Sequence, residues 1–199
     1  MVCTQVACDP DIELMLLVKQ GDEDAFGELM NRYRRPLTGF FYSLCWSHDT
    51  AQDCAQEVLV SLWLARERYQ PIGRFKSYIY RIARNVWLQD LRSRKCRPQP
   101  LYFEELGLAE DAVDIEKLLI RRYVDRRIRL AVAGLPENHR LVFVLSHFQG
   151  LKYWEIAEIL EIPIGTVKSR MSNAVRMLRE KIKDEMADGQ WPMADGSPH

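Results

Sequence analysis

The sequence predicts an all-α protein made of two small helical domains joined by a flexible linker, the second containing a helix-turn-helix. Apolar residues recur at three- and four-residue steps along most of the 199-residue chain, and no β-type alternation persists. The proline-rich stretch 97–100 interrupts this pattern and marks a domain boundary. We therefore divide the chain into a first domain at 1–95, a linker at 96–112, a second domain at 113–183 and a disordered tail at 184–199.

Four helices are expected in the first domain. The first covers about 11–19, the second begins with an acidic turn at Asp22, and Pro36 is expected to open a new segment. Asp49 can cap the third helix, and Ser77 can cap a fourth that runs to about residue 94. The core side of the fourth helix consists of Ile79, Ile82, Ala83 and Val86.

The second domain is also helical. Periodicity resumes at about 113–132, and Pro136 suits the first turn of a helix at 137–148. A short helix at about 153–160 must end before Pro163, because proline removes an N–H and restricts the residue before it. The helix that follows carries one apolar face, formed by Val167, Met171, Ala174, Leu178 and Ile182.

The opposite face of that last helix is polar and basic near its N-terminus, as a helix that reads the DNA major groove requires. This face carries Thr166, Lys168, Ser169, Ser172, Asn173 and Arg176. A solvated face could have the same composition, but the short helix that precedes it at turn spacing favours DNA binding. The turn commonly carries glycine and here has Glu161, so a left-handed conformation would cost about 1 kcal/mol.

Charge is distributed in blocks, although the formal net charge is zero. Residues 68–100 hold 9 Lys/Arg against 1 Asp/Glu, and residues 164–183 hold 6 against 1. The intervening and flanking segments 1–67, 101–163 and 184–199 have net charges of −6, −3 and −4. Two separated basic blocks are typical of a protein that binds a polyanion at two places.

The five cysteines form no CxxC pair, and neither a signal peptide nor a membrane-spanning run is evident. We therefore expect a reduced, cytoplasmic protein without membrane insertion. Cys45 and Cys54 lie among apolar helix residues and are expected in the core. Cys3 and Cys8 are a poor ligand set by themselves, so we expect no metal site and no cofactor.

Four segments occur in an order that resembles one protein family. They are QDCAQEVLVSLW (52–63), RYQPIGRFKSYIYRIARNVWLQDLRSRK (68–95), LPENHRLVFVLSHFQGLKYWEIAEIL (135–160) and IPIGTVKSRMSNAVRMLRE (162–180). Together they resemble extracytoplasmic-function sigma factors, the compact two-domain members of the bacterial sigma family. The resemblance covers about residues 10–183. It implies a subunit that binds core RNA polymerase and promoter DNA, reads the −35 and −10 elements, helps to melt DNA and is controlled by an anti-sigma factor.

The resemblance also implies roles for three groups of residues. The helix at 52–63 would dock on the clamp of the largest catalytic polymerase subunit through Asp53, Gln56, Glu57 and Trp63, although Trp63 could instead be core. The basic block would capture an unstacked −10 base with Tyr69, Arg74, Phe75 and Lys76. It would hold the freed strand with Arg84, Asn85, Gln89 and Arg92. The bases of the −35 element would meet Lys168, Ser169, Ser172 and Asn173, and its phosphates would meet Thr166 and Arg176.

Three other classes of function remain as alternatives. A conventional helix-turn-helix regulator would bind an operator as a dimer, with residues 1–95 as a sensor, but it leaves the basic, aromatic block unused. An anti-sigma or adaptor protein would lack the second basic block. An enzyme has no supporting motif, since the chain shows no Gly-rich phosphate loop, no HExxH and no Ser/His/Asp order.

Overall fold

The computed structural model describes residues 9–93 and 127–187, and all regular structure within those ranges is helical. The first range contains α1 (Pro10–Lys19), α2 (Glu23–Cys45), α3 (His48–Leu64), the single 3₁₀ turn η2 (Arg66–Arg68) and α4 (Phe75–Ser93). The second range begins with a helical stretch at 127–133 and continues with α6 (Glu137–His147), α7 (Tyr153–Leu160) and α8 (Ile164–Ala187). The predicted all-α class is confirmed. The predicted linker at 96–112 lies outside the described residues.

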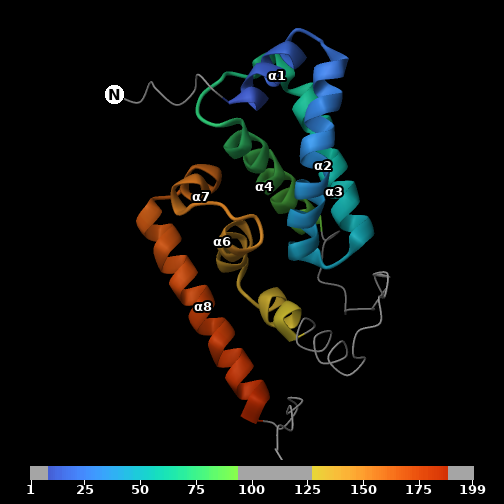
Figure 1. Cartoon of the computed structure of the whole chain (residues 1–199). Coiled ribbons are helices and arrows are strands. Elements are labelled where there is room, and N and C mark those ends of the chain that lie inside the picture. The colour runs from blue at the N-terminus through green and yellow to red at the C-terminus, as the bar shows by residue number, and fades with distance from the viewer. Residues whose placement is uncertain (1–8, 94–126, 188–199) are drawn as a thin grey trace, which may run out of the picture.

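Helix α2 is continuous, so the break predicted at Pro36 is wrong. Proline inside a helix removes one backbone hydrogen bond and costs about 3 kcal/mol. Pro36 is exposed, whereas Tyr33, Leu37 and Phe40 on either side of it are buried on one stripe. α2 and α3 lie side by side as an antiparallel pair (Figure 1). Burial of this stripe therefore offsets the local cost of the proline.

The ends of two helices differ from those predicted. Ser47, rather than Asp49, caps α3, and its hydroxyl oxygen accepts a hydrogen bond from the N–H of Thr50 at 3.4 Å. α4 begins at Phe75 instead of Ser77, and Ser77 is buried. The two added residues allow the Phe75 side chain to enter the core, where it is fully buried.

One carboxylate, that of Asp9, serves the first turns of two helices. Oδ1 of Asp9 accepts the N–H of Asp11 at 3.1 Å in α1, and Oδ2 accepts the N–H of Phe75 at 3.2 Å in α4. The first N–H groups of a helix have no partner within the helix, and its N-terminus favours negative charge. Asp9 therefore joins two elements that are 66 residues apart in sequence.

The second range forms a helix-turn-helix from α7 and α8. Glu161 ends α7 in the left-handed conformation, with φ 56° and ψ 45°, which confirms the conformation considered from the sequence. Pro163 follows, and its carbonyl accepts the N–H groups of Thr166 and Val167 at 2.9 and 3.2 Å. α8 continues to Ala187, four residues past the predicted end of the domain at 183.

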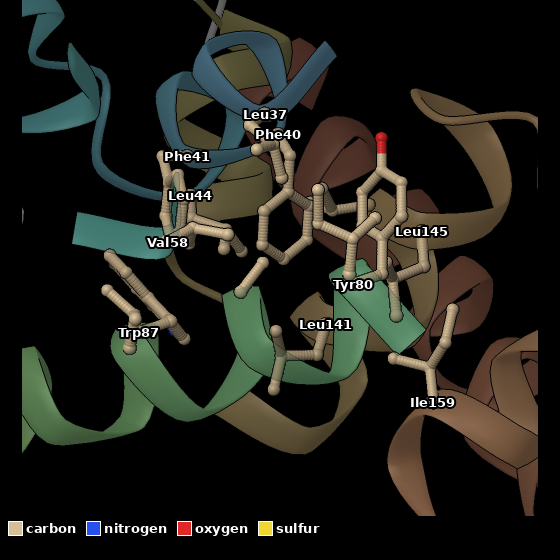
Figure 2. Packing of buried hydrophobic residues seen from close by; sticks show 14 of the residues in the cluster. Leu37, Phe40, Phe41, Leu44, Val58, Tyr80, Trp87, Leu141, Leu145 and Ile159 are labelled. Atoms are coloured by element: carbon tan, nitrogen blue, oxygen red, sulfur yellow. The ribbon is translucent and has the colours of Figure 1, made fainter. Parts of the chain in front are cut away.

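The two predicted domains share one hydrophobic core. α4 lies between the α2–α3 pair on one side and α7 on the other (Figure 1). Figure 2 shows Leu37 and Phe40 of α2 close to Tyr80 of α4, with Leu145 of α6 and Ile159 of α7 on the other side of that ring. All five side chains are buried. The units therefore pack directly against each other.

Replacement of the shared cap should destabilise the fold more than replacement of another acidic residue near a helix end. We expect Asp9→Ala to lower the free energy of unfolding by about 1–2 kcal/mol, because two N–H groups lose their acceptor. Asp24→Ala, at an exposed position in the first turn of α2, should change it by no more than about 0.5 kcal/mol. Urea unfolding followed by circular dichroism measures both values. Equal effects of the two variants would contradict the shared cap.

Candidate nucleic-acid interface

The polar face of α8 is open to solvent. Lys168, Ser169, Ser172, Asn173 and Arg176 are exposed, and Thr166 is half-buried at the first turn. The opposite face packs inward, with Val167, Ala174 and Leu178 buried, as the sequence predicted. Burial of the apolar side chains on one side thus presents a single row of polar and basic side chains on the other, a shape that fits a major groove.

Two side chains of this row already make local contacts. The Ser169 hydroxyl donates to the carbonyl of Thr166 at 3.0 Å, a bond within the helix. Arg176 pairs with Glu180 one turn later at 3.1 Å, and both side chains are more than half exposed. Such an exposed pair is worth at most about 1 kcal/mol, so Arg176 can exchange its carboxylate partner for a phosphate at little cost.

The predicted −10 residues differ widely in their exposure to solvent. Tyr69 is 2% exposed and Phe75 is fully buried, so these rings do not form an open base-capturing pocket in this arrangement. Their rings lie 6.2 Å apart, edge to face, and Tyr78 packs on both. Large aromatic rings contribute most when they are buried, which explains why the core takes them. Asn85, Gln89 and Arg92 are exposed along α4.

Burial raises the pKa of the tyrosines of this region. Loss of solvent is the main cause for Tyr69, and together with the negative charge of Asp9 it raises the pKa of Tyr69 to about 12. Burial alone raises the pKa of Tyr80. The neutral Tyr80 hydroxyl donates to Oε1 of Gln149, in the second unit, at 2.7 Å.

The remaining arginines of the −10 group are engaged by α7. Arg74 lies 3.4 Å from the carboxylate of Glu155, and its guanidinium sits over the ring of Trp154 at 4.7 Å. Arg84 donates to the carbonyl of Ile159 at 3.0 Å and to Glu161 at 3.2 Å. Lys76 is half-buried.

Sequence reasoning missed these α7 partners. The signal that could have indicated them is the three-residue spacing of Glu155, Glu158 and Glu161 in and directly after the short helix. The same spacing is equally typical of a helix face that is exposed to solvent.

The predicted polymerase-binding helix α3 presents an exposed face that differs in part from the prediction. Asp53, Gln56 and Glu57 are exposed, as expected. Two residues not predicted extend this face, Val60 at 49% and Leu64 at 73% exposure. Val60 and Leu64 lie on the same side of the helix as Asp53, Gln56 and Glu57, at three- and four-residue steps. The sequence alone could therefore have predicted that they belong to this face.

Trp63 points away from that face and packs on the first unit. Its ring lies 4.9 Å from that of Phe26, and the guanidinium of Arg66 sits 4.3 Å from its centre. Arg66 also donates to the carbonyl of Trp63 at 2.9 Å. The sequence left open whether Trp63 is a core residue or an exposed residue of the polymerase interface. These contacts fit the first interpretation better.

Comparisons with known proteins agree with this arrangement. The models of two families match, Sigma-70 region 2 over residues 29–96 and Sigma-70, region 4, over residues 125–178. The ECF RNA polymerase sigma-E factor of Haemophilus influenzae is 31% identical over 188 residues, which cover 88% of this chain and 97% of that relative. The chain belongs to the extracytoplasmic-function sigma factors.

Other relatives place this sigma factor in the same family. The ECF RNA polymerase sigma factor SigW of Bacillus subtilis is 28% identical over 179 residues, covering 84% of this chain and 94% of SigW. The solved structure of CnrH in complex with the cytosolic domain of CnrY has the same fold, with a TM-score of 0.68 at 21% identity, over 89% of this chain and 99% of that chain. The protein is thus an RNA polymerase sigma factor, and the operator-binding alternative is not favoured.

The packing of Trp63 leads to a direct stability test. Trp63→Ala should lower the free energy of unfolding by about 2 kcal/mol, because it removes half-buried aromatic area and the Arg66 contact. Leu64→Ala, at a position 73% exposed, should change it by less than about 0.5 kcal/mol. Urea unfolding of the two variants provides the measurement. If the Trp63→Ala protein is as stable as the wild type, Trp63 is not held by the core and remains a candidate for the polymerase interface.

Proposed function

We propose that this sigma factor reads the −35 element with α8, reads the −10 element and holds the freed strand with α4, and docks on core RNA polymerase with the exposed face of α3. The observation that supports it most strongly is the open polar row of α8, directly after the turn of the helix-turn-helix. It acts by binding, without a catalytic step of its own. We expect the protein in the cytoplasm, because the promoter DNA that it would bind is there.

The proposal assigns each element a partner of matching chemistry. Phosphate contacts fix the position of a protein on DNA, whereas base-edge contacts carry the sequence preference. In α8, Thr166 and Arg176 would meet phosphates, while Lys168 and Asn173 have the side chains that suit guanine and adenine. In α4, Asn85, Gln89 and Arg92 are exposed members of the −10 group.

The partners on the protein side are core polymerase and an anti-sigma factor. The α3 face combines acidic, amide and apolar side chains, a mixture that suits a protein partner with basic residues around an apolar centre. The sigma factor RpoE from Bartonella quintana, whose fold is similar, was solved in complex with the anti-sigma factor NepR, which supports an anti-sigma partner for this chain. Within the described residues, no helix combines the length and the apolar character needed to cross a membrane.

The general test is reconstitution. Purified protein, combined with core RNA polymerase, should start transcription from a limited set of fragments in a genomic library. Transcription from no fragment, with core enzyme that responds to a known sigma factor, would contradict the proposal.

Two α8 variants separate base reading from phosphate binding. Asn173→Ala should relax the preference at one base pair of the −35 element by about 1–3 kcal/mol, whereas Arg176→Ala should weaken all promoters alike. A randomised −35 library transcribed by the reconstituted holoenzyme measures both effects. Lys183→Ala, which removes one positive charge about two turns further along α8, is the matched control. Loss of base preference in Arg176→Ala but not in Asn173→Ala would reverse the assignment.

A double variant tests the α3 face. Gln56→Ala with Glu57→Lys should abolish association with core polymerase, since truncating or reversing interface residues costs about 2–4 kcal/mol. Both residues are exposed, so the melting temperature should stay nearly unchanged. The control is Gln20→Ala plus Glu13→Lys, which makes the same changes at exposed positions in α1 and directly after it. Pull-down with core enzyme and a melting curve are measured on the same preparation of each variant. Retained binding by the folded α3 variant would remove this face from the interface.

A further inference from the structure

A cavity of about 390 Å³ lies where the end of α2 meets the second unit. Its lining comes from three segments that are far apart in sequence, namely the last two turns of α2, the helical stretch at 127–133 and the residues directly after α6. The end of α2 and the 127–133 stretch are neighbours in Figure 1. Natural small-molecule sites have volumes of about 300–1,000 Å³, so the cavity is large enough for a small ligand. The described residues that line it include none of those assigned to DNA or core polymerase.

Three aromatic rings form the apolar part of the cavity wall. The ring centres of Tyr42 and Trp46 lie 5.6 Å apart, and those of Trp46 and Phe148 lie 6.4 Å apart, both edge to face. Aromatic rings at such separations attract each other through their quadrupoles, beyond the gain from burial alone. The wall therefore suits a ligand with a flat ring better than one with a flexible aliphatic chain.

Arg129 brings a positive charge to the same cavity. Its guanidinium lies 5.9 Å from the centre of the Tyr42 ring and 5.4 Å from that of the Trp46 ring, and Nη1 donates to the Tyr42 hydroxyl at 3.3 Å. These contacts hold the guanidinium at the wall but supply no opposite charge. Among the described residues, no carboxylate forms an ion pair with Arg129, although the residue is half-buried. Arginine stays charged and carries five N–H donors, so Arg129 can still bind an anion.

Gln149 adds a neutral donor to the cavity wall. The Tyr80 hydroxyl donates to Oε1 of Gln149 at 2.7 Å, which leaves the amide N–H groups of Gln149 as donors. No aspartate or glutamate is among the described lining residues, so nothing in that part of the wall repels a negative charge. Arginine and amide N–H groups are the donors that a carboxylate accepts. The cavity thus combines aromatic walls with donors for one carboxylate.

We propose that this cavity is a binding site for a small planar aromatic acid. The aromatic ring of the ligand packs on Trp46 and its neighbouring rings, and the carboxylate of the ligand accepts hydrogen bonds from Arg129 and Gln149. The site does not depend on the proposed contacts with DNA and core polymerase. It makes the sigma factor responsive to the concentration of a small molecule in addition to its macromolecular partners.

Three probes of similar size test the ligand class on the purified full-length protein. Cinnamate is a planar aromatic acid, cinnamamide is its neutral counterpart, and octanoate is an acid without a ring. Isothermal titration calorimetry should show cinnamate binding about tenfold more tightly than cinnamamide, because a charged acceptor strengthens the hydrogen bonds. Cinnamate should also bind more tightly than octanoate. Failure of cinnamate to bind would overturn the site, and equal or tighter binding of either other probe would overturn the ligand class.

A variant that fills the cavity tests the location. Gly39 lines the cavity within α2, and a Cβ added there meets no heavy atom within 4 Å. Gly27, about three turns earlier in α2, has the same open space around its Cβ and provides the matched control. Leucine favours a helix over glycine, so neither Gly39→Leu nor Gly27→Leu should lower the melting temperature. We expect Gly39→Leu to weaken cinnamate binding about tenfold or more, since the leucine side chain takes the place of the ring. Equal affinities of Gly39→Leu and Gly27→Leu would place the ligand elsewhere and overturn the proposal.

Replacement of the arginine tests the carboxylate contact. Arg129→Gln removes the charge but keeps an N–H donor, and Arg35→Gln makes the same change at an exposed position of α2. Arg129→Gln should weaken cinnamate binding about tenfold and leave cinnamamide binding nearly unchanged, because only the acid needs the charge. Arg35→Gln should bind both probes as the wild type does. An equal loss for both probes in Arg129→Gln would show that Arg129 only shapes the wall, and would overturn the contact with the carboxylate.

Discussion

The arrangement depends on α4 being buried from two sides. One side packs on α2 and α3, and the other packs on α7 and reaches Glu137 at the start of α6. Its largest side chains on the second side, Tyr80 and Trp87, are each 1% exposed, yet each carries a polar atom that needs a partner when buried. The second unit supplies both partners, Gln149 for the Tyr80 hydroxyl and Glu137 for the Trp87 N–H. Without that unit, these aromatic rings would face water.

The same contact decides which charges the protein displays. The sequence carries two basic blocks, and the structure treats them differently. The block in α8 keeps its exposed row, whereas three arginines of the block in α4 meet acceptors from α7. A chain of zero net charge can thus hold one basic surface open and another one paired with acceptors of its own. Exposed ion pairs are weak and screened by salt, so such pairing is reversible.

Local rules explain much of each unit, and they fail where distant residues intervene. Pro36 is a helix breaker by its chemistry, but the buried stripe on both sides of it holds α2 together. Ser77 has the side chain of a cap, but the acceptor at the start of α4 comes from Asp9 instead. Trp63 shares a helix with Asp53 and Glu57, yet Phe26 and Arg66 hold its ring on another side. In each case the deciding partner is remote in sequence or belongs to another helix.

The sequence by itself determined the helical class, the helix-turn-helix and the polar row of α8, because these depend on spacing within one helix and on the chemistry of Pro163. It also determined the exposed acidic face of α3 through the same periodicity, and the burial of Cys45 and Cys54. Only the tertiary structure decided that Tyr69 and Phe75 are core rather than open to a base. It alone placed the α4 arginines against α7. Those outcomes depend on which faces of separate helices meet, and periodicity along one helix carries no information about its partner.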